Sequence, residues 1–462
     1  MIKITKRPLF YIFLLIVQAT LCRNVLASEI LFTIHGSNTV GASLGPALAA
    51  GFLENQGASD VRVLSDKSIN ESMIKGFMAA DNKEVAIKIE AHGSSTGFKG
   101  LQSRQADIAA SSRRGKESER SLLWANCDLF SEQSEYVIGI DGLAIIVHPD
   151  NPVSALSVDQ VARLFSGSIS NWKQLGGRDL AVTPLARDEQ SGTWDTFKSL
   201  VLAKKHKLKS RVERFESNEV LSATVVSSPG GIGFVSLNTI GAAKPLKVAD
   251  AAGKSLSPSV INVSTEDYLL SRRLYMYIPE NNDKPMARAF LEYAIGKEGQ
   301  SIVESVGYVA QSIQPKASDQ SAMPADYQKL VDSFTRLSVN FRFEQGKAKL
   351  DNKAIRDIGR LADFLAIDDR SIRLIGFGET NDDSPFSKTL AKLRADVVRR
   401  HLVRAGVSRG SIELAGYVPV VDMDLEDSRL KVIRDRRVEV WLYDTTTATF
   451  EPEPAATTVM SH

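Results

Sequence analysis

Short runs rich in β-branched residues alternate with segments of helical periodicity from Glu29 to about Gln314. The run Val85–Glu90 reads Val-Ala-Ile-Lys-Ile-Glu and is followed by the helix-compatible stretch Gly97–Gln105. Such alternation is typical of α/β folds, in which helices connect the strands of a sheet and cover its faces. Because the chain has 462 residues, more than one hydrophobic core is expected. The sequence therefore predicts a large α/β unit and at least one further unit.

A polar stretch without apolar periodicity separates this pattern from a second folded segment. Between Pro315 and Pro324 the residues are small and polar, which is typical of a linker. Beyond it we expect a small α+β domain of the order β-α-β-α-β, with strands Ser338–Phe343, Ile372–Ile375 and Val438–Leu442 and helices Asp351–Leu365 and Ser387–Ala405. The tail lacks any pattern and is expected to be disordered. The expected divisions are 1–27 for a signal peptide, 28–314 for the large domain, 315–330 for the linker, 331–445 for the small domain and 446–462 for the tail.

The N-terminus has the features of a secretory signal peptide. A basic start precedes the apolar stretch Leu9–Ala19, which is short for a membrane-spanning helix, and cleavage is expected near Ala27. Secretion of this kind places the protein in the periplasm or the outer envelope. Cys22 as a lipid-attachment residue is disfavoured, because Leu21 stands where such signals need a small residue. With the signal removed, Cys127 has no partner for an internal disulfide bond.

The charge balance indicates that any anion must be bound locally. The 57 Lys and Arg residues and 55 Asp and Glu residues leave a net charge of +2, which offers no support for a nucleic-acid partner. Four segments of the large domain place hydroxyl groups or a cation next to backbone N–H groups. These segments are Gly36–Val40, Gly93–Gly97, Asp107–Arg114 and Arg187–Thr193.

The chemistry of these segments suits a tetrahedral oxyanion. The first two each follow a strand and precede a helix, so that hydroxyls and N–H groups face one point. In the fourth, Arg187 offers a planar two-pronged cation beside a Ser-Gly-Thr turn that opens a helix. Each segment alone could be an ordinary helix cap. Their joint occurrence predicts a phosphate site.

With these residues in view, the large domain resembles the PstS-like substrate-binding proteins of phosphate ABC importers. The resemblance is carried, in order, by Gly36–Val40, Gly93–Gly97, Ala106–Arg113, Leu164–Gly167 with Asn171 and Trp172, Arg187–Thr193, Gly231–Val235, Gly299–Gln300 and Val306–Tyr308. It implies a two-lobed α/β periplasmic binding protein of type II that grips phosphate between its lobes, without catalysis, cofactor or metal. Matching positions imply these phosphate ligands: Asn38, Thr39, Ser94, Arg187, Ser191, Gly192 and Thr193.

One departure from the family concerns the choice of phosphate over sulfate. Some members carry an aspartate where this chain has Ser112, and that carboxylate accepts the proton of a protonated phosphate oxygen. Sulfate brings no proton and is rejected. Ser112 remains in the predicted site, and Asp141, which precedes an apolar stretch, is the candidate for the missing acceptor. A solvated turn aspartate is the alternative for Asp141.

The small domain resembles the OmpA C-terminal family of peptidoglycan-binding domains, on the segments Leu390–Ala395 and Asp435–Val440. In that family an aspartate and an arginine fifteen residues later bind a diaminopimelate side chain, and opposite charges suit such a zwitterion. Here Arg394 holds the arginine position, Glu379 the acid position, and Ser387 replaces the usual asparagine. The predicted peptidoglycan site is therefore Glu379 with Arg394. A structural or partner-binding role for the same fold is the alternative.

Together these features predict a secreted envelope protein that binds inorganic phosphate in an interlobe cleft and is tethered to peptidoglycan, with an inner-membrane phosphate importer as a candidate partner. A phosphatase acting in the same cleft is the alternative from another class, since His35 and His92 adjoin the anion segments. The six histidines show neither metal-ligand spacing nor a nucleophile motif, which argues against it. An adhesion or matrix protein that kept the fold is a third interpretation.

Overall fold

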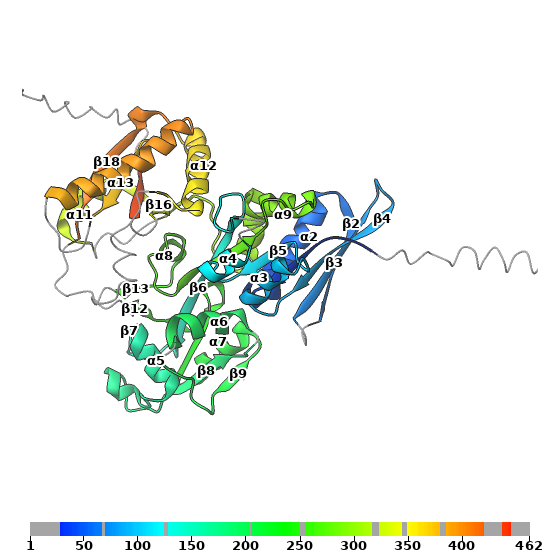
Figure 1. Ribbon diagram of the computed structural model, residues 1–462. Coiled ribbons are helices and arrows are strands. Elements are labelled where there is room, and N and C mark those ends of the chain that lie inside the picture. Colours follow the sequence, from blue (N-terminus) through cyan, green and yellow to red (C-terminus); the bar gives the residue numbers. More distant parts are fainter. Residues whose placement is uncertain are drawn as a thin grey trace, which may run out of the picture.

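The computed structural model describes residues 28–444 except 67–69, 124–127, 190, 204, 250–254, 317–322, 344–348, 379–384 and 420–436. The predicted signal peptide, the predicted tail and Glu379 lie outside the described residues. The described part forms two lobes and a small C-terminal domain (Figure 1). Among its helices, none combines the length and the apolar character needed to cross a bilayer.

One sheet of eleven strands runs through both lobes in the order β2-β3-β4-β1-β5-β14-β6-β10-β8-β9, with β11 also paired to β6. Its strands are β1 Glu29–Gly36, β2 Ala58–Asp66, β3 Glu71–Met78, β4 Lys83–Glu90, β5 Ile108–Ser111, β6 Glu135–Val147, β8 Thr183–Arg187, β9 Glu213–Phe215, β10 Gly231–Ser236, β11 Lys244–Pro245 and β14 Ser271–Tyr277. A smaller sheet joins β7 Ala155–Ser157, β12 Lys247–Ala249 and β13 Ser255–Leu256.

Strand β6 belongs to both lobes. Its residues 135–142 pair with β14, whereas its residues 143–147 pair with β10. The chain therefore crosses from the first lobe to the second near Asp141 and returns at the start of β14. These two crossings form the hinge, because a strand shared by two lobes is where their relative motion must be absorbed.

Each lobe has its own hydrophobic core and helices. The first core includes Phe32, Phe52 and Phe290, and the second includes Phe165 and Phe234. The helices of the first lobe are η1 Val40–Leu44, α2 Gly45–Asn55, α3 Ser94–Gln102, α4 Glu117–Leu123, α9 Pro285–Ile295 and α10 Lys297–Val306. Those of the second are α5 Val158–Ser166, η2 Trp172–Leu175, α6 Gly192–Phe197, η3 Lys198–Leu202, α7 Asn218–Ser227, η4 Leu237–Thr239 and α8 Val260–Ser264. Separate cores confirm the predicted two-lobed α/β architecture.

Local sequence signals fix the elements that carry the predicted anion segments. Gly36 ends β1 with φ 138°, and a Cβ there would lie 2.0 Å from the Ala110 carbonyl oxygen, so only glycine allows β1 to approach β5 this closely. In the second lobe, the hydroxyl of Ser191 accepts a hydrogen bond from the Trp194 N–H at 3.4 Å and caps α6. Both segments are thereby held at strand and helix ends.

The small domain has a five-stranded sheet in the order β15-β16-β19-β17-β18. Its elements are β15 Pro315–Lys316, α11 Ala325–Val331, β16 Phe334–Arg342, α12 Asn352–Ile367, β17 Ile372–Phe377, α13 Pro385–Arg404, η5 Arg409–Ser411, β18 Ile412–Tyr417 and β19 Arg437–Tyr443. The predicted order β-α-β-α-β omitted β18, because this short run alternates weakly and pairs in parallel with β17 through a long-range contact. The end of the predicted linker is part of helix α11 (Ala325–Val331), whose Tyr327 and Val331 are buried in the small domain.

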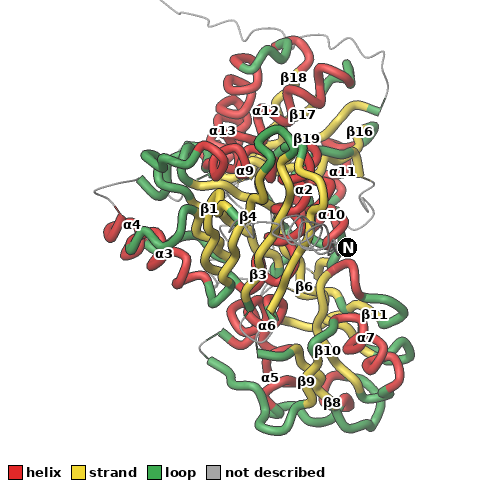
Figure 2. Tube along the Cα trace, turned by 90° about the vertical axis from the view of Figure 1, so that its right-hand side faces the viewer, coloured by secondary structure: helices red, strands yellow, loops and turns green. Residues whose placement is uncertain are grey.

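The small domain lies against the hinge. Figure 2 shows it at one end of the molecule, beyond the first lobe, while Figure 1 shows α8 between it and the second lobe. Helix α12 contacts β6, and α8 contacts β16. The domain is therefore packed on the binding lobes.

Candidate functional site

Three predicted segments of the first lobe meet at the carboxyl ends of the parallel strands β1, β4 and β5. The Gly93 N–H donates to the Gly36 carbonyl at 2.7 Å, which joins the first two segments. The Ser94 hydroxyl accepts from the Ser112 N–H at 3.2 Å and lies 3.4 Å from the Ser112 hydroxyl. Ligands of open α/β sheets bind at this edge.

Ser37, which the sequence interpretation did not single out, adds a buried hydroxyl to these segments. Its side chain is 1% exposed, and its Oγ has no hydrogen-bond partner among the described residues. A buried hydroxyl without a partner is destabilising, and a bound anion would satisfy it. Its place in the segment Gly36–Val40 was the signal that could have identified it.

Arg187 ends β8 as a buried cation held mainly by neutral groups. Its Nε donates to the Phe215 carbonyl at 3.0 Å, Nη2 donates to the Glu216 carbonyl, and Nη1 lies 3.4 Å from the Thr193 hydroxyl. The carboxylate of Asp188 is 3.8 Å away. Burial lowers the pKa of Arg187, although neighbouring acids oppose the shift. The guanidinium is therefore fixed in place with little of its charge compensated.

The two lobes touch at two predicted ligands. The Thr39 hydroxyl donates to the Gly192 carbonyl at 3.3 Å, and a Cβ on Gly192 would lie 2.2 Å from Thr39 Cα. The Tyr308 hydroxyl donates a hydrogen bond to the Thr39 carbonyl at 2.9 Å. Asn38 is the half-buried neighbour of Thr39 at the helix start. The two lobes are therefore in direct contact here, and this arrangement is called closed below.

Arg272 in β14 lies at this contact, and the sequence interpretation missed it. Its Nη2 donates to the Thr39 hydroxyl at 2.7 Å and to the Gly192 carbonyl at 2.9 Å, while Nε donates to Asp141 Oδ2 at 3.3 Å. Burial lowers its pKa, and the carboxylates of Asp141 and Asp195 oppose that shift. An arginine pair between the apolar runs Leu269–Leu270 and Leu274–Tyr277 was the signal that could have identified it.

Asp141 was expected before an apolar strand, with a solvated turn as the alternative, but the structure places it within the strand. Asp141 lies inside β6 and is 3% exposed, because the apolar strand begins at Glu135. Its Oδ2 accepts from the Thr196 hydroxyl at 2.8 Å as well as from Arg272. Asp141 is thus a buried hinge residue with a charged partner.

The predicted ligands form two groups that meet at the interlobe contact. Ser94 and Ser112 belong to the first lobe, whereas Ser191, Gly192, Thr193 and Arg187 belong to the second. Among the described residues, no hydrogen bond joins Ser94 or Ser112 to Arg187. The segment of Asn38 and Thr39 is joined to that of Ser94 by the Gly93–Gly36 hydrogen bond, and Thr39 touches Gly192 of the second lobe.

The two histidines beside the anion segments are paired with carboxylates. His35 Nε2 lies 3.3 Å from Glu90, and His92 Nε2 lies 3.5 Å from Glu71. Ligand atoms of Glu71, Glu90 and His92 lie within 4.8 Å of one another. The ammonium of Lys88 already binds Glu90 at 2.5 Å, so a cation occupies this group of carboxylates. Both imidazoles thus lie beside carboxylates.

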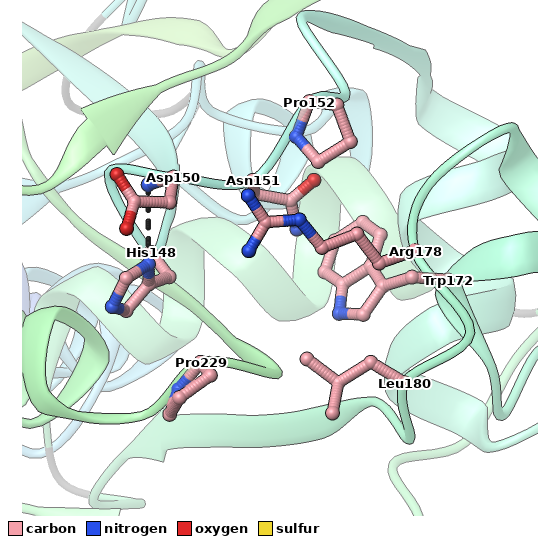
Figure 3. A pocket seen from close by; sticks show the side chains of 8 residues that line it. All are labelled: His148, Asp150, Asn151, Pro152, Trp172, Arg178, Leu180 and Pro229. Atoms are coloured by element: carbon pink, nitrogen blue, oxygen red, sulfur yellow. Dashed lines mark hydrogen bonds between the residues drawn. The ribbon is translucent and has the colours of Figure 1, made fainter.

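A small cavity of about 20 Å³ lies in the second lobe (Figure 3). It is lined by His148, Asp150, Asn151, Pro152, Trp172, Arg178, Leu180 and Pro229. The ring nitrogen Nδ1 of His148 accepts from the Asp150 N–H at 3.1 Å. The volume suits a single water molecule, and none of the predicted phosphate ligands lines it.

Comparison with known families decides the class of the large domain. A family described as the PBP superfamily domain matches residues 54–298, more than half of the chain. The chain belongs to the PBP superfamily. The OmpA family matches residues 342–431, which identifies the C-terminal part as an OmpA family domain. Both predicted resemblances are confirmed.

Individual relatives cover the PBP domain. The phosphate-binding protein PstS of Staphylococcus epidermidis RP62A is 27% identical over 296 residues, which are 62% of this chain and 87% of that protein. The PstS of Bacillus subtilis 168 is 26% identical over 275 residues, 57% of this chain and 82% of that protein. The crystal structure of a possible phosphate binding protein from Planctomyces limnophilus is 20% identical, with a TM-score of 0.49 and coverage of 66% of this chain and 96% of that one.

In the OmpA family domain, Arg394 lies on α13, and its guanidinium donates to the Phe377 carbonyl at the end of β17. Phe377 is two residues before Glu379 in the sequence, and Glu379 lies outside the described residues. Ser387 is 1% exposed. A Cβ on Gly378 would lie 2.6 Å from its hydroxyl, so Ser387 packs against the end of the β17 strand.

Proposed function

We propose that the protein binds inorganic phosphate between its two lobes. The observation that carries the proposal is Arg187, a buried guanidinium that neutral carbonyls hold in place and that no carboxylate contacts closely. With its nearest carboxylate 3.8 Å away, this buried charge is only partly compensated, and a bound anion would relieve the remaining cost of burial. Relatives named as phosphate-binding proteins support phosphate as this anion.

In this proposal each lobe contributes one half of the ligand set. Ser94, Ser112, Asn38 and Thr39 donate from the first lobe. Arg187 with Ser191, Gly192 and Thr193 donates from the second, and the buried hydroxyl of Ser37 joins them. Phosphate would then bridge serines and a guanidinium that make no direct contact, which is how a ligand shifts a hinged protein towards its closed state.

Selectivity over sulfate is assigned to the hinge carboxylate. Arg272 and Thr196 both contact Oδ2 of Asp141. The proposal therefore leaves Oδ1 as the acceptor for a phosphate proton. Sulfate, which carries no proton near neutral pH, would gain nothing from this oxygen.

Titration calorimetry on the signal-free chain, stripped of carried-over anion, tests the proposal. Phosphate should bind with a stoichiometry of one, and sulfate and molybdate should bind more weakly. Failure of phosphate to produce heat or thermal stabilisation would reject it. Release of phosphate from an aryl phosphate, measured alongside, would instead favour the phosphatase alternative.

We further propose that the protein acts as an envelope receptor and not as an enzyme. Its PBP relatives are named as binding proteins and its C-terminal part belongs to the OmpA family, which supports a location outside the cytoplasm. The basic and apolar N-terminus supports export through a signal peptide. Delivery of phosphate to an inner-membrane importer is the role that such relatives suggest.

Wall binding is assigned to Glu379 and Arg394. Changing Arg394 to alanine should abolish retention on purified sacculi, because the guanidinium supplies the carboxylate-binding half of the site. The matched control is Arg404→Ala, an exposed arginine on the same helix. Co-sedimentation measures the bound fraction, and equal retention of wild type and Arg394→Ala would remove this residue from the site.

A further inference from the structure

Two consecutive arginines of the hinge strand β14 point to opposite faces. Successive side chains of a strand alternate, so Arg272 and Arg273 must diverge. Arg272 enters the interlobe contact, where it binds Thr39. Arg273 instead binds Asp351 of the small domain at 2.7 Å and also pairs with Glu266. The hinge strand thus joins the proposed anion site to the small domain.

The second lobe contacts the small domain through residues 265–267, which follow α8. Asp267 accepts from Arg336 and from Arg342, each at 3.1 Å. The Thr265 carbonyl accepts from Arg342 at 2.9 Å and from the Asn340 amide at 3.1 Å. All three donors lie on β16.

The first lobe contacts the same domain through the start of β6. The Asn352 amide donates to the Phe130 carbonyl at 2.9 Å and to the Glu135 carboxylate at 3.2 Å. Arg356 donates to the Glu135 carbonyl at 2.7 Å, and its guanidinium stacks over the ring of Tyr136. The small domain therefore binds both lobes as well as the strand between them.

The charges in this interface are buried and mutually compensated. Burial alone would raise the pKa of Glu266, but Arg273, Lys353 and Arg342 outweigh it and lower the pKa to about 2. Removing one partner from such a network leaves a buried charge unpaired, which is strongly destabilising for the docked arrangement. The docked arrangement is therefore held by paired buried charges.

We infer that the small domain braces the hinge in the closed arrangement and that Asp351 and Arg356 are positioning residues for anion binding. The inference rests on the proposed function. Docking is inferred to favour the closed arrangement because Thr39 of one lobe touches Gly192 of the other when the small domain is docked. When the closed, binding-competent state is already populated, less of the binding free energy is needed to close the hinge.

A single substitution in the full signal-free chain tests the brace. Asp351 uses Oδ1 to cap α12, accepting from the Ala354 N–H at 2.8 Å, and Oδ2 to bind Arg273. Asp351→Ser keeps a cap and loses the interdomain pair. Phosphate affinity should fall by about fivefold to tenfold, with faster dissociation. The control is Asp396→Ser, which removes ion pairs with Arg399 and Arg400 on α13.

An interlobe distance separates the brace from phosphate binding itself. Spin labels at Gln102 in the first lobe and Ser227 in the second, with Cys127 changed to serine, report the hinge angle in phosphate-free protein. The Asp351→Ser chain should show a broader or longer distance distribution than the control. Arg356→Ala, which removes a contact between the small domain and the first lobe, should also broaden or lengthen the distance distribution.

Each outcome decides the inference. Unchanged distances and unchanged phosphate affinity in both interface variants would overturn it, as would tighter binding. If the wild type binds no phosphate, the proposed function fails, yet broadened distances would still support the brace. Asp351→Glu should keep the wild-type distances, because glutamate retains the charge that pairs with Arg273.

Discussion

The Gly192→Ala variant is expected to bind phosphate at least about 100-fold more weakly than the wild type, a loss of about 2.8 kcal/mol. The added Cβ would lie 2.2 Å from Thr39 Cα and 2.7 Å from its hydroxyl, so the lobes could not approach as they do in the structure. Because Thr39 belongs to the other lobe, the clash exists only in the closed arrangement. Calorimetric titration with phosphate measures the loss.

The matched control for this substitution is Gly359→Ala on α12. A Cβ at Gly359 meets nothing within 4 Å, and alanine is the better helix former. Without phosphate, Gly359→Ala should melt close to the wild-type temperature, whereas Gly192→Ala should melt somewhat lower, because its Cβ clashes with Thr39 in the closed arrangement. A Gly192→Ala chain that binds phosphate as tightly as Gly359→Ala would show that this interlobe contact plays no part in binding.

Replacing Arg187 with glutamine is expected to weaken phosphate binding by at least about 30-fold, since truncating a buried charge partner costs about 2–5 kcal/mol. The free protein should change less. Burial lowers the pKa of Arg187, so the free protein bears a cost for holding this cation, and that cost is removed with the charge. The rise in melting temperature caused by phosphate should therefore shrink more than the melting temperature of the free protein.

Arg163→Gln on α5 serves as the control, because this arginine is exposed. It should keep the wild-type affinity and the full thermal response to phosphate. If Arg187→Gln behaves like Arg163→Gln in both measurements, the buried guanidinium does not bind the anion, and the main support for the proposed site is lost.

The sequence predicted the two-lobed α/β fold because its strands and helices carry local periodicity and caps. The segment around Ser191 shows this, since the serine caps α6 as its neighbours indicate. Asp141 and Arg272 could not be placed in the same way. They are partners across β6 and β14, and a charged residue in an apolar strand is explained only by a partner that is remote in the chain.

The small domain shows the same limit. Its long helices were predicted within two residues, whereas β18 was missed because its six residues gain their stability from pairing with β17. The sequence interpretation also did not predict that this domain docks on the hinge. Arg273, Asp351 and Glu266 read separately as surface charges, and only the fold brings them into one buried network.

A crystal structure of the signal-free chain grown with phosphate tests the central claim most directly. We expect one phosphate between the lobes, with oxygens about 2.7–3.1 Å from the Arg187 guanidinium, from the hydroxyls of Ser94 and Thr193 and from donors of the Thr39 segment. Phosphate bound elsewhere, or an interlobe space that stays free of it at saturating concentration, would contradict the account.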